Sequence, residues 1–317
     1  MKIAEVRFLQ KEESLSLPFW TNVLSKKMRE KYILSKKPFA VEEKDGVLHG
    51  VLSFSQGEGL PLAWRNKAED LVKALAAEGA GILIPPYEGE FPQKILPVAK
   101  GRVLAALFAF DGGAEALRRQ GKNPQEAHFV ISGTDPEVLS MVLAGMGPYV
   151  NHLSFFADTG GELEEVQERF FAEKGLRTEV FSSPKNPLFS EADVVIVCGM
   201  EQTGYEHILK RYAVFMDAAG NRPALRRLLQ RRWDVAAAEG FYFQVGEAQK
   251  EGRWAEALAF TQSMAFQNFW MENFPPNRAA SGYLALAEQG FSVCGFSAFG
   301  KRVKIAKIKE DLDISGD

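Results

Sequence analysis

Residues 128–136, HFVISGTDP, decide the fold of this chain. The first five form an apolar run that is typical of a buried strand. Thr134 or Asp135 can cap a following helix, and Pro136 suits the first helical position. We therefore predict a strand over residues 128–132 that leads directly into a helix over residues 136–146, which is the start of a βαβ unit.

The same alternation continues towards the carboxyl terminus. We expect further strands at 153–157, 177–181, 192–198 and 213–217, and helices at 161–173 and 205–210. Strands that alternate with helices predict a parallel sheet covered on both faces, and short right-handed crossovers make it a doubly wound, Rossmann-like sheet. Ligands of such sheets bind at the carboxyl ends of the strands. Here those ends are Ser132 and Gly133, Asp158 and Thr159, Gly199, and residues 217–221.

The rest of the chain predicts a two-domain α/β protein with an extension. The amino-terminal part reads as strands at 2–9 and 81–84, a hairpin around Asp45 and Gly46, helices at 19–31 and 66–77, and a two-part helix at 102–119 that breaks around Asp111. Helices at 254–271 and 279–289 and a hairpin at 291–308 follow the parallel sheet. We therefore expect a smaller α/β substrate-type domain over 1–120, a Rossmann-like domain over 121–245, and a helical and hairpin extension over 246–317.

Composition excludes several classes of protein. The 317 residues carry a net charge of −3, which gives no electrostatic reason to expect nucleic acid or a membrane surface as partner. Two cysteines and four isolated histidines predict no metal site. The amino terminus lacks the apolar core of a signal peptide, and no apolar run is long enough to span a bilayer, so we expect a cytoplasmic protein.

Several short segments occur in the order found in the shikimate dehydrogenase family, which they resemble. They are SLSLP at 14–18 with Asn22, GILIPPYE at 81–88, DGG at 111–113, ADVVI at 192–196, Asp217 followed by NRP at 221–223, and Glu239 and Gly240 followed by Glu247 and Ala248. The last pair resembles a late helix of that family. The resemblance covers about 240 residues and stops short of the carboxyl-terminal part.

This resemblance implies a substrate-binding amino-terminal domain and a Rossmann domain that presents a nicotinamide cofactor. Ser14 and Ser16 would bind a substrate carboxylate, and Asp111 would form one half of a Lys–Asp proton-transfer pair. Glu88 stands where the family has the lysine, and Glu247 where it has a substrate-binding glutamine. A carboxylate in the lysine's place reverses the local electrostatics, so we expect another small hydroxy or keto acid rather than shikimate.

Ser14, Ser16 and Asp111 should then converge in one cleft that faces Gly133. This expectation tests the family resemblance, because it joins the substrate side chains to the phosphate loop.

The expected phosphate loop departs from the usual pattern. Gly133 is the one glycine of 132–137 that matches G-x-G-x-x-G, and Asp135 adds negative charge beside Pro136, which lacks an N–H. Thr134 and Gly199 complete the candidate cofactor site, and Asp158 favours a ribose hydroxyl, hence NAD over NADP. A purely structural interpretation is that Thr134 or Asp135 caps the helix and Asp158 is a solvated carboxylate.

Two functions remain open at this stage. The first is a divergent NAD(P)-dependent oxidoreductase, and the second is a catalytically inactive protein that binds a small ligand or partner in the same cleft. Cys198 is a buried core residue or a nucleophile, and Arg222 belongs to a solvated face or binds an anion. The aromatic run at 266–274 packs the last helices onto the sheet or forms a homodimer face.

Overall fold

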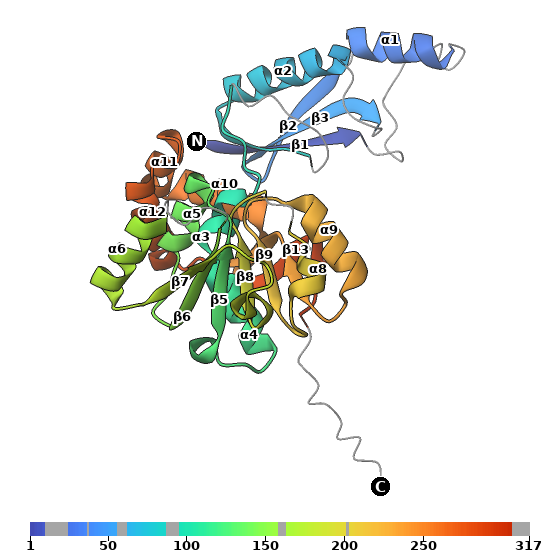
Figure 1. The fold of residues 1–317 in the computed structure, drawn as a ribbon. Helices are drawn as coiled ribbons and strands as arrows, with labels where there is room; N and C mark the ends of the chain where they lie inside the picture. Colours follow the sequence, from blue (N-terminus) through green and yellow to red (C-terminus); the bar gives the residue numbers. More distant parts are fainter. Residues whose placement is uncertain are drawn as a thin grey trace. The chain divides into compact units, whose positions relative to one another are not determined.

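The computed structural model describes residues 1–9, 25–36, 38–55, 62–86, 95–157, 163–200 and 203–305. The chain forms two compact α/β units (Figure 1). One unit comprises residues 1–100 and 256–264, and the other comprises residues 101–255 and the segment from residue 265 onwards. The predicted α/β class is confirmed. The domain ranges 1–120, 121–245 and 246–317 stay predictions, because compactness alone does not define an independently folding domain.

The first unit is built on a four-stranded sheet in the order β2-β3-β1-β4. Strand β1 runs parallel to β3 and β4, while β2 and β3 form an antiparallel hairpin. The hairpin turns at Asp45 and Gly46, both with positive φ, as the Asp-Gly pair predicts. The elements are β1 (Lys2–Leu9), α1 (Lys26–Lys36), β2 (Phe39–Lys44), β3 (Val47–Ser55), α2 (Leu62–Ala77) and β4 (Ala80–Ile84).

Helix α2 covers this sheet with an apolar face. Ala68, Leu71 and Leu75 recur at helical spacing and are fully buried against the strands. Gly50 of β3 makes room for them, since a Cβ there would lie 3.1 Å from a Leu71 methyl carbon. Helix α1 begins at Lys26 and ends at Lys36, whereas the sequence predicted a helix over 19–31, of which residues 19–24 lie outside the described residues.

The second unit contains a six-stranded parallel sheet in the order β10-β9-β8-β5-β6-β7. When the strands of this sheet are numbered along the chain from β5, their order across the sheet is that of dinucleotide-binding Rossmann folds. The direction of the strand order reverses between β5 and β8. The predicted doubly wound sheet is therefore confirmed. Its strands are β5 (His128–Ser132), β6 (His152–Phe156), β7 (Thr178–Phe181), β8 (Val194–Val197), β9 (Val214–Asp217) and β10 (Ala236–Ala238).

Helices pack on both faces of the parallel sheet. On one face, Val130, Val195 and Phe215 share a core with α7, α8 and α9. On the other face, α4 lies so close that a Cβ on its Gly113 would be 2.9 Å from Val194 Cγ1. The helices of this part are α3 (Arg102–Leu107), α4 (Ala109–Arg119), α5 (Pro136–Ala144), α6 (Glu164–Lys174), α7 (Pro187–Ser190), α8 (Tyr205–Ile208) and α9 (Arg222–Arg231), with a 3₁₀ turn at Pro124–Glu126.

The break between α3 and α4 corrects one prediction. It falls at Phe108, whereas the sequence predicted a break around Asp111 and the two glycines that follow it. Gly112 and Gly113 lie inside α4, where a Cβ on Gly112 would meet the Phe241 ring at 2.4 Å. These glycines therefore permit close packing and do not end a helix.

A third, antiparallel sheet has the order β12-β11-β13-β14. The predicted hairpin around Gly300 is confirmed, but the segment compared with a late helix is a β-hairpin in which Phe241 and Phe243 alternate into the core. The elements are β11 (Gly240–Val245), β12 (Ala248–Glu251), α10 (Gly252–Gln262), α11 (Met264–Met271), α12 (Pro276–Glu288), β13 (Ser292–Ala298) and β14 (Lys301–Val303). None of the helices in the described ranges is long and apolar enough to cross a membrane.

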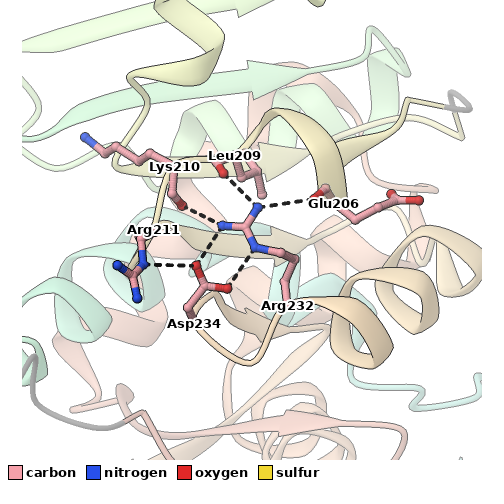
Figure 2. A network of polar contacts seen from close by, with 6 residues as sticks. All are labelled: Glu206, Leu209, Lys210, Arg211, Arg232 and Asp234. Carbon is pink, nitrogen blue, oxygen red and sulfur yellow. Dashed lines mark hydrogen bonds and ion pairs between the residues drawn. The ribbon is translucent and has the colours of Figure 1, made fainter.

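A polar network centred on Arg232 ties α9 to the chain that leads into β9 (Figure 2). Arg232 Nε and Nη2 donate to the two carboxylate oxygens of Asp234 at 2.8 and 2.9 Å. The same guanidinium donates to the carbonyl oxygens of Leu209 at 2.8 Å, of Glu206 at 3.2 Å and of Lys210 at 3.3 Å. The hydrogen bond from Arg232 lowers the pKa of Asp234. The network lies before the first residues of β9 and β10, so it braces the amino edge of the sheet.

Candidate functional site

The carboxyl edge of the parallel sheet is where the strand order reverses. β5 ends at Ser132 and β8 at Val197, and the Cys198 N–H donates to the Ser132 carbonyl oxygen at 2.7 Å. The loops that carry Gly133 and Gly199 therefore leave the sheet side by side. Ligands of open α/β sheets bind at this position, so the structure brings these two predicted residues together.

Gly133 gives the loop after β5 its sharp turn. Its φ of 96° lies in the left-handed region, which side chains rarely adopt. Its N–H donates to the Phe156 carbonyl oxygen at 3.0 Å, which extends the β5–β6 pairing by one residue. The backbone then passes through Thr134 and Asp135 into α5.

Asp135 caps helix α5. Its carboxylate accepts the N–H groups of Glu137 and Val138, each at 3.1 Å, and Pro136 occupies the first turn. Of the two caps that the sequence allowed, the structure selects Asp135. The first free donors of the helix are therefore already satisfied by a side chain of the protein itself.

These contacts fit a dinucleotide in one respect and oppose it in another. Among the described residues, the N–H groups of Thr134 and Asp135 have no hydrogen-bond partner, and Gly133 lets a phosphate come close. The carboxylate of Asp135, however, occupies the donors that a pyrophosphate usually takes and adds negative charge. The backbone suits a phosphate, and the acidic cap weakens its binding.

A buried hydrogen bond supports this edge from below. Ser132 Oγ and Tyr205 OH lie 2.9 Å apart, and both side chains are fully buried. Tyr205 comes from α8, so the bond joins the end of β5 to the helix that follows β8. Cys198 is also fully buried, as its interpretation as a core residue predicts.

Asp217 lies at the end of β9, one strand beyond β8. The residue is 3% exposed, and its Oδ1 accepts the Asn221 N–H at 2.7 Å. Burial raises the pKa of Asp217 to about 6, although the N–H groups of Asn221 and Gly220 act in the opposite direction. The sequence placed Asp217 at a strand end but gave it no role. A buried acid at the ligand edge is a candidate functional group that sequence reasoning missed.

Asp111 is engaged by two tyrosines. Tyr149 OH donates to its Oδ1 at 3.0 Å, and Tyr283 OH donates to its Oδ2 at 2.8 Å. Burial raises the pKa of Asp111 against these two hydrogen bonds, and it also raises the pKa of both tyrosines.

Asp111 is not brought to Gly133. Tyr149 lies after the carboxyl end of α5, whereas Gly133 precedes its amino end. The neighbouring Phe110 ring packs 5.4 Å from the ring of Phe129, near the start of β5. The proton-transfer role of Asp111 stays a prediction.

The remaining predicted site residues are spread along the chain. Ser14, Ser16, Glu88 and Asp158 lie outside the described residues. Glu247 is exposed at the turn between β11 and β12, so it does not lie on the helix that the resemblance implied. Among the described residues, no group of three His, Cys, Asp or Glu side chains is arranged to hold a metal ion.

Comparison with known proteins reveals similarity in structure but not in sequence. No protein-family model matches the chain, and no similar sequence was found among curated proteins. Shikimate 5-dehydrogenase from Listeria monocytogenes, solved with shikimate and NAD, is 11% identical over 90% of this chain and 92% of its own, with a TM-score of 0.33.

Two further solved structures show similarity at the same level. L-tryptophan dehydrogenase from Nostoc punctiforme is 11% identical over 91% of this chain and 79% of its own, with a TM-score of 0.33. Aspartate transcarbamoylase from Trypanosoma cruzi is 11% identical over 74% of this chain and 77% of its own, with a TM-score of 0.37. At these values the similarity extends no further than the fold, which the strand order establishes independently.

Proposed function

We propose that this chain is an oxidoreductase that binds NAD at the carboxyl edge of its parallel sheet and acts on a small hydroxy or keto acid. The observation that carries the proposal is the left-handed Gly133 at the end of β5, where the strand order reverses. Loops of this geometry allow close approach of a phosphate to the backbone.

The residues that would hold the cofactor lie around this turn. The N–H groups of Thr134 and Asp135 would meet the pyrophosphate, and Gly199 would leave room beside them. Asp158, at the end of β6 in the sequence, would select the ribose hydroxyl of NAD over the phosphate of NADP. A bound nicotinamide supplies hydride-transfer chemistry.

A second candidate function is binding of a small ligand without catalysis. The observation that favours it is the cap of α5, because Asp135 already satisfies the N–H groups of Glu137 and Val138. In a protein that does not bind a dinucleotide, such a cap stabilises the helix, and the blocked donors are not needed for a phosphate.

Calorimetric titration with NAD⁺ and NADP⁺ tests the proposal, using wild type, Gly133→Ala and a matched control. Gly121→Ala is that control, because Gly121 also has a positive φ, 83°, and a Cβ there would meet nothing within 4 Å. Both substitutions place a side chain on a left-handed residue, at a cost of about 1–2 kcal/mol. We expect millimolar or tighter binding of NAD⁺, at least about tenfold weaker for Gly133→Ala alone.

Absence of binding by either dinucleotide at millimolar concentration contradicts the proposal. Equal losses in the two glycine variants also contradict it, because they would reflect backbone strain and not the site. Absence of dinucleotide binding is also the outcome that the second candidate predicts, because the observation that favours it is a cap that occupies the donors of α5.

A further inference from the structure

Positive charge is concentrated in the segment that contains α8 and α9. Residues 207–233 include seven arginine and lysine residues and a single acidic residue, Asp217, which is buried. The whole chain has a net charge of −3, so its overall charge conceals this local surplus. A weakly acidic protein can therefore present a basic surface to a partner.

Two arginines of α9 converge on one buried carboxylate oxygen. Arg231 Nη1 lies 3.2 Å and Arg227 Nε lies 3.6 Å from Glu206 Oε1. The side chain of Glu206 is 5% exposed, whereas that of Arg231 is 57% exposed. One carboxylate cannot neutralise two guanidinium groups, so positive charge remains at the surface for an external anion.

The neighbouring Arg232–Asp234 pair adds a third exposed cation (Figure 2). Both oxygens of Asp234 already accept from Arg232, at 2.8 and 2.9 Å. Arg211 Nε lies 4.0 Å from Asp234 Oδ2, and the side chain of Arg211 is 67% exposed. Together with the pair at Glu206, four guanidinium groups face two carboxylates, which leaves a surplus of two positive charges.

Trp233 carries an indole ring into solvent beside these cations. The residue is 86% exposed, more than any other large hydrophobic residue in the part of the chain that the structure describes. Its backbone is fixed, because its neighbours Arg232 and Asp234 hold each other and the Tyr212 N–H donates to the Asp234 carbonyl oxygen at 2.8 Å. The Arg211 guanidinium lies 5.8 Å from the centre of the Tyr212 ring. Aromatic rings and cations therefore alternate at this point of the surface.

Isolated aromatic rings among arginines favour a nucleic acid over a protein as partner. The centre of a protein–protein interface is apolar and depleted in charge, whereas interfaces with nucleic acids are polar and strongly positive. Within residues 207–233, Leu229 is the one other large hydrophobic residue that is exposed. The faces of bases are open for stacking on an indole in a single strand but not within a duplex.

We propose that Arg211, Arg227, Arg231 and Trp233, called the Arg–Trp surface below, bind single-stranded nucleic acid. The guanidinium groups donate to phosphates of the strand, and a base stacks on Trp233. Every base has a face that can stack, so we expect little sequence preference. Arg211 precedes β9 and Trp233 precedes β10, so this surface lies at the amino edge of the parallel sheet and does not depend on the proposed cofactor site at the opposite edge.

Fluorescence anisotropy tests the proposal with the whole chain and labelled oligo(dT) and oligo(U) of about 12 nucleotides, over a series of salt concentrations. The variants are Trp233→Ala, Trp233→Tyr, Arg211→Gln and Arg231→Gln. The control is Arg226→Gln, which removes the same charge from another face of α9, where the Arg226 guanidinium lies 5.6 Å from the centre of the Phe299 ring.

We expect micromolar binding of both oligonucleotides at about 0.1 M salt. Trp233→Ala should weaken binding at least about fivefold, because the stacked base is lost, and Trp233→Tyr should retain most of the affinity. Arg211→Gln and Arg231→Gln should each weaken binding and lower the slope of log affinity against log salt by about 0.7. Arg226→Gln should change the affinity less than about twofold. Trp233 and Arg211 are exposed, so their substitution should not prevent folding.

The proposal is overturned if neither oligonucleotide binds at millimolar protein concentration, if Trp233→Ala binds as wild type does, or if Arg226→Gln weakens binding as much as Arg211→Gln. Equal binding of a DNA duplex, inorganic polyphosphate, polyglutamate or vesicles that contain phosphatidylserine also overturns it. Each of these probes supplies negative charge without an open base face, so the surface would then recognise charge alone.

Discussion

Asp217 illustrates at the scale of one residue how position determines chemistry. Its carboxyl group lies at a strand end, buried, with hydrogen bonds on one oxygen and none on the other among the described residues. The charged groups around it are Arg102 and Glu239, which act on its pKa in opposite directions. The protein therefore keeps an acid that is easily protonated at the edge where ligands of this fold bind.

The raised pKa predicts how stability depends on pH. The pKa of Asp217 is about 6 in the folded chain against an ordinary value of 3.8, so the folded state binds the proton more tightly. This contribution is fully present below about pH 4, is lost as pH rises towards 6, and stays lost above it. The difference corresponds to about 3 kcal/mol.

Urea unfolding at several pH values checks this prediction. Wild type should lose stability over this range as Asp217 ionises, whereas Asp217→Asn has no carboxyl group to ionise. The free energy of unfolding of Asp217→Asn should therefore rise relative to that of wild type by about 3 kcal/mol between pH 4 and pH 8. Parallel pH profiles for the two proteins would show that burial does not perturb this carboxyl group.

Single residues were predictable where local chemistry decides them. Gly133 was recognised as the loop glycine, and Asp135 was one of two expected caps. The pairing of Arg231 with Glu206 was not recognised, because only the packing of α9 beside α8 brings these two residues together. The role of Asp217 depends on burial, which a strand end in the sequence does not reveal.

At the scale of elements, helix α5 joins stability to ligand binding. Asp135 stabilises its amino end but places a negative charge where a pyrophosphate would lie. Asp135→Ser should retain the cap and remove the charge, and so tighten NAD⁺ binding by several-fold, since one such charge is worth about 1 kcal/mol near water.

Calorimetry on wild type, Asp135→Ser and Asp135→Ala measures this effect. Asp135→Ala removes the cap as well and should lose about 1 kcal/mol of stability. Unchanged or weaker NAD⁺ binding by Asp135→Ser would contradict the assignment of this helix end to the phosphate site.

The Arg232 network yields a second prediction at this scale. Arg232→Lys cannot reproduce the two-pronged contact with Asp234 together with three carbonyl contacts, so we expect a loss of about 2–3 kcal/mol in the free energy of unfolding. Arg211→Lys is the control, because Arg211 is exposed and its Nε lies 4.0 Å from Asp234; it should change stability by less than about 0.5 kcal/mol. Equal effects in the two variants would show that the network adds no stability.

Five of the six strands of the parallel sheet, β5 to β9, were predicted because their apolar runs are bounded by clear turns. The sixth, β10, was not predicted, because three alanines do not favour a strand. The β-hairpin of β11 and β12 was not, because Phe241 and Phe243 alternate over a segment too short to distinguish from a helix. The break at Phe108 was misplaced for a related reason. Gly112 and Gly113 are required inside α4 because Phe241 and Val194 approach them closely, and these two residues are distant in sequence.

At the scale of the whole molecule, the doubly wound sheet follows from alternation of strands and helices, and the structure confirms it. The division of the chain between the two compact units does not follow from this alternation. Residues 256–264 return to the first unit, while the helices from Arg102 to Arg119 belong to the second. These assignments depend on tertiary packing, which the local sequence pattern does not reveal.

Hydrogen–deuterium exchange with and without saturating NAD⁺ tests the central claim most directly, because it locates the bound cofactor along the chain. The proposed site predicts slower exchange at the amides of residues 133–135, 137–138 and 198–199, around the turn of Gly133. Unchanged exchange in these two segments, or protection confined to other parts of the chain, would contradict a dinucleotide site at the carboxyl edge of the sheet.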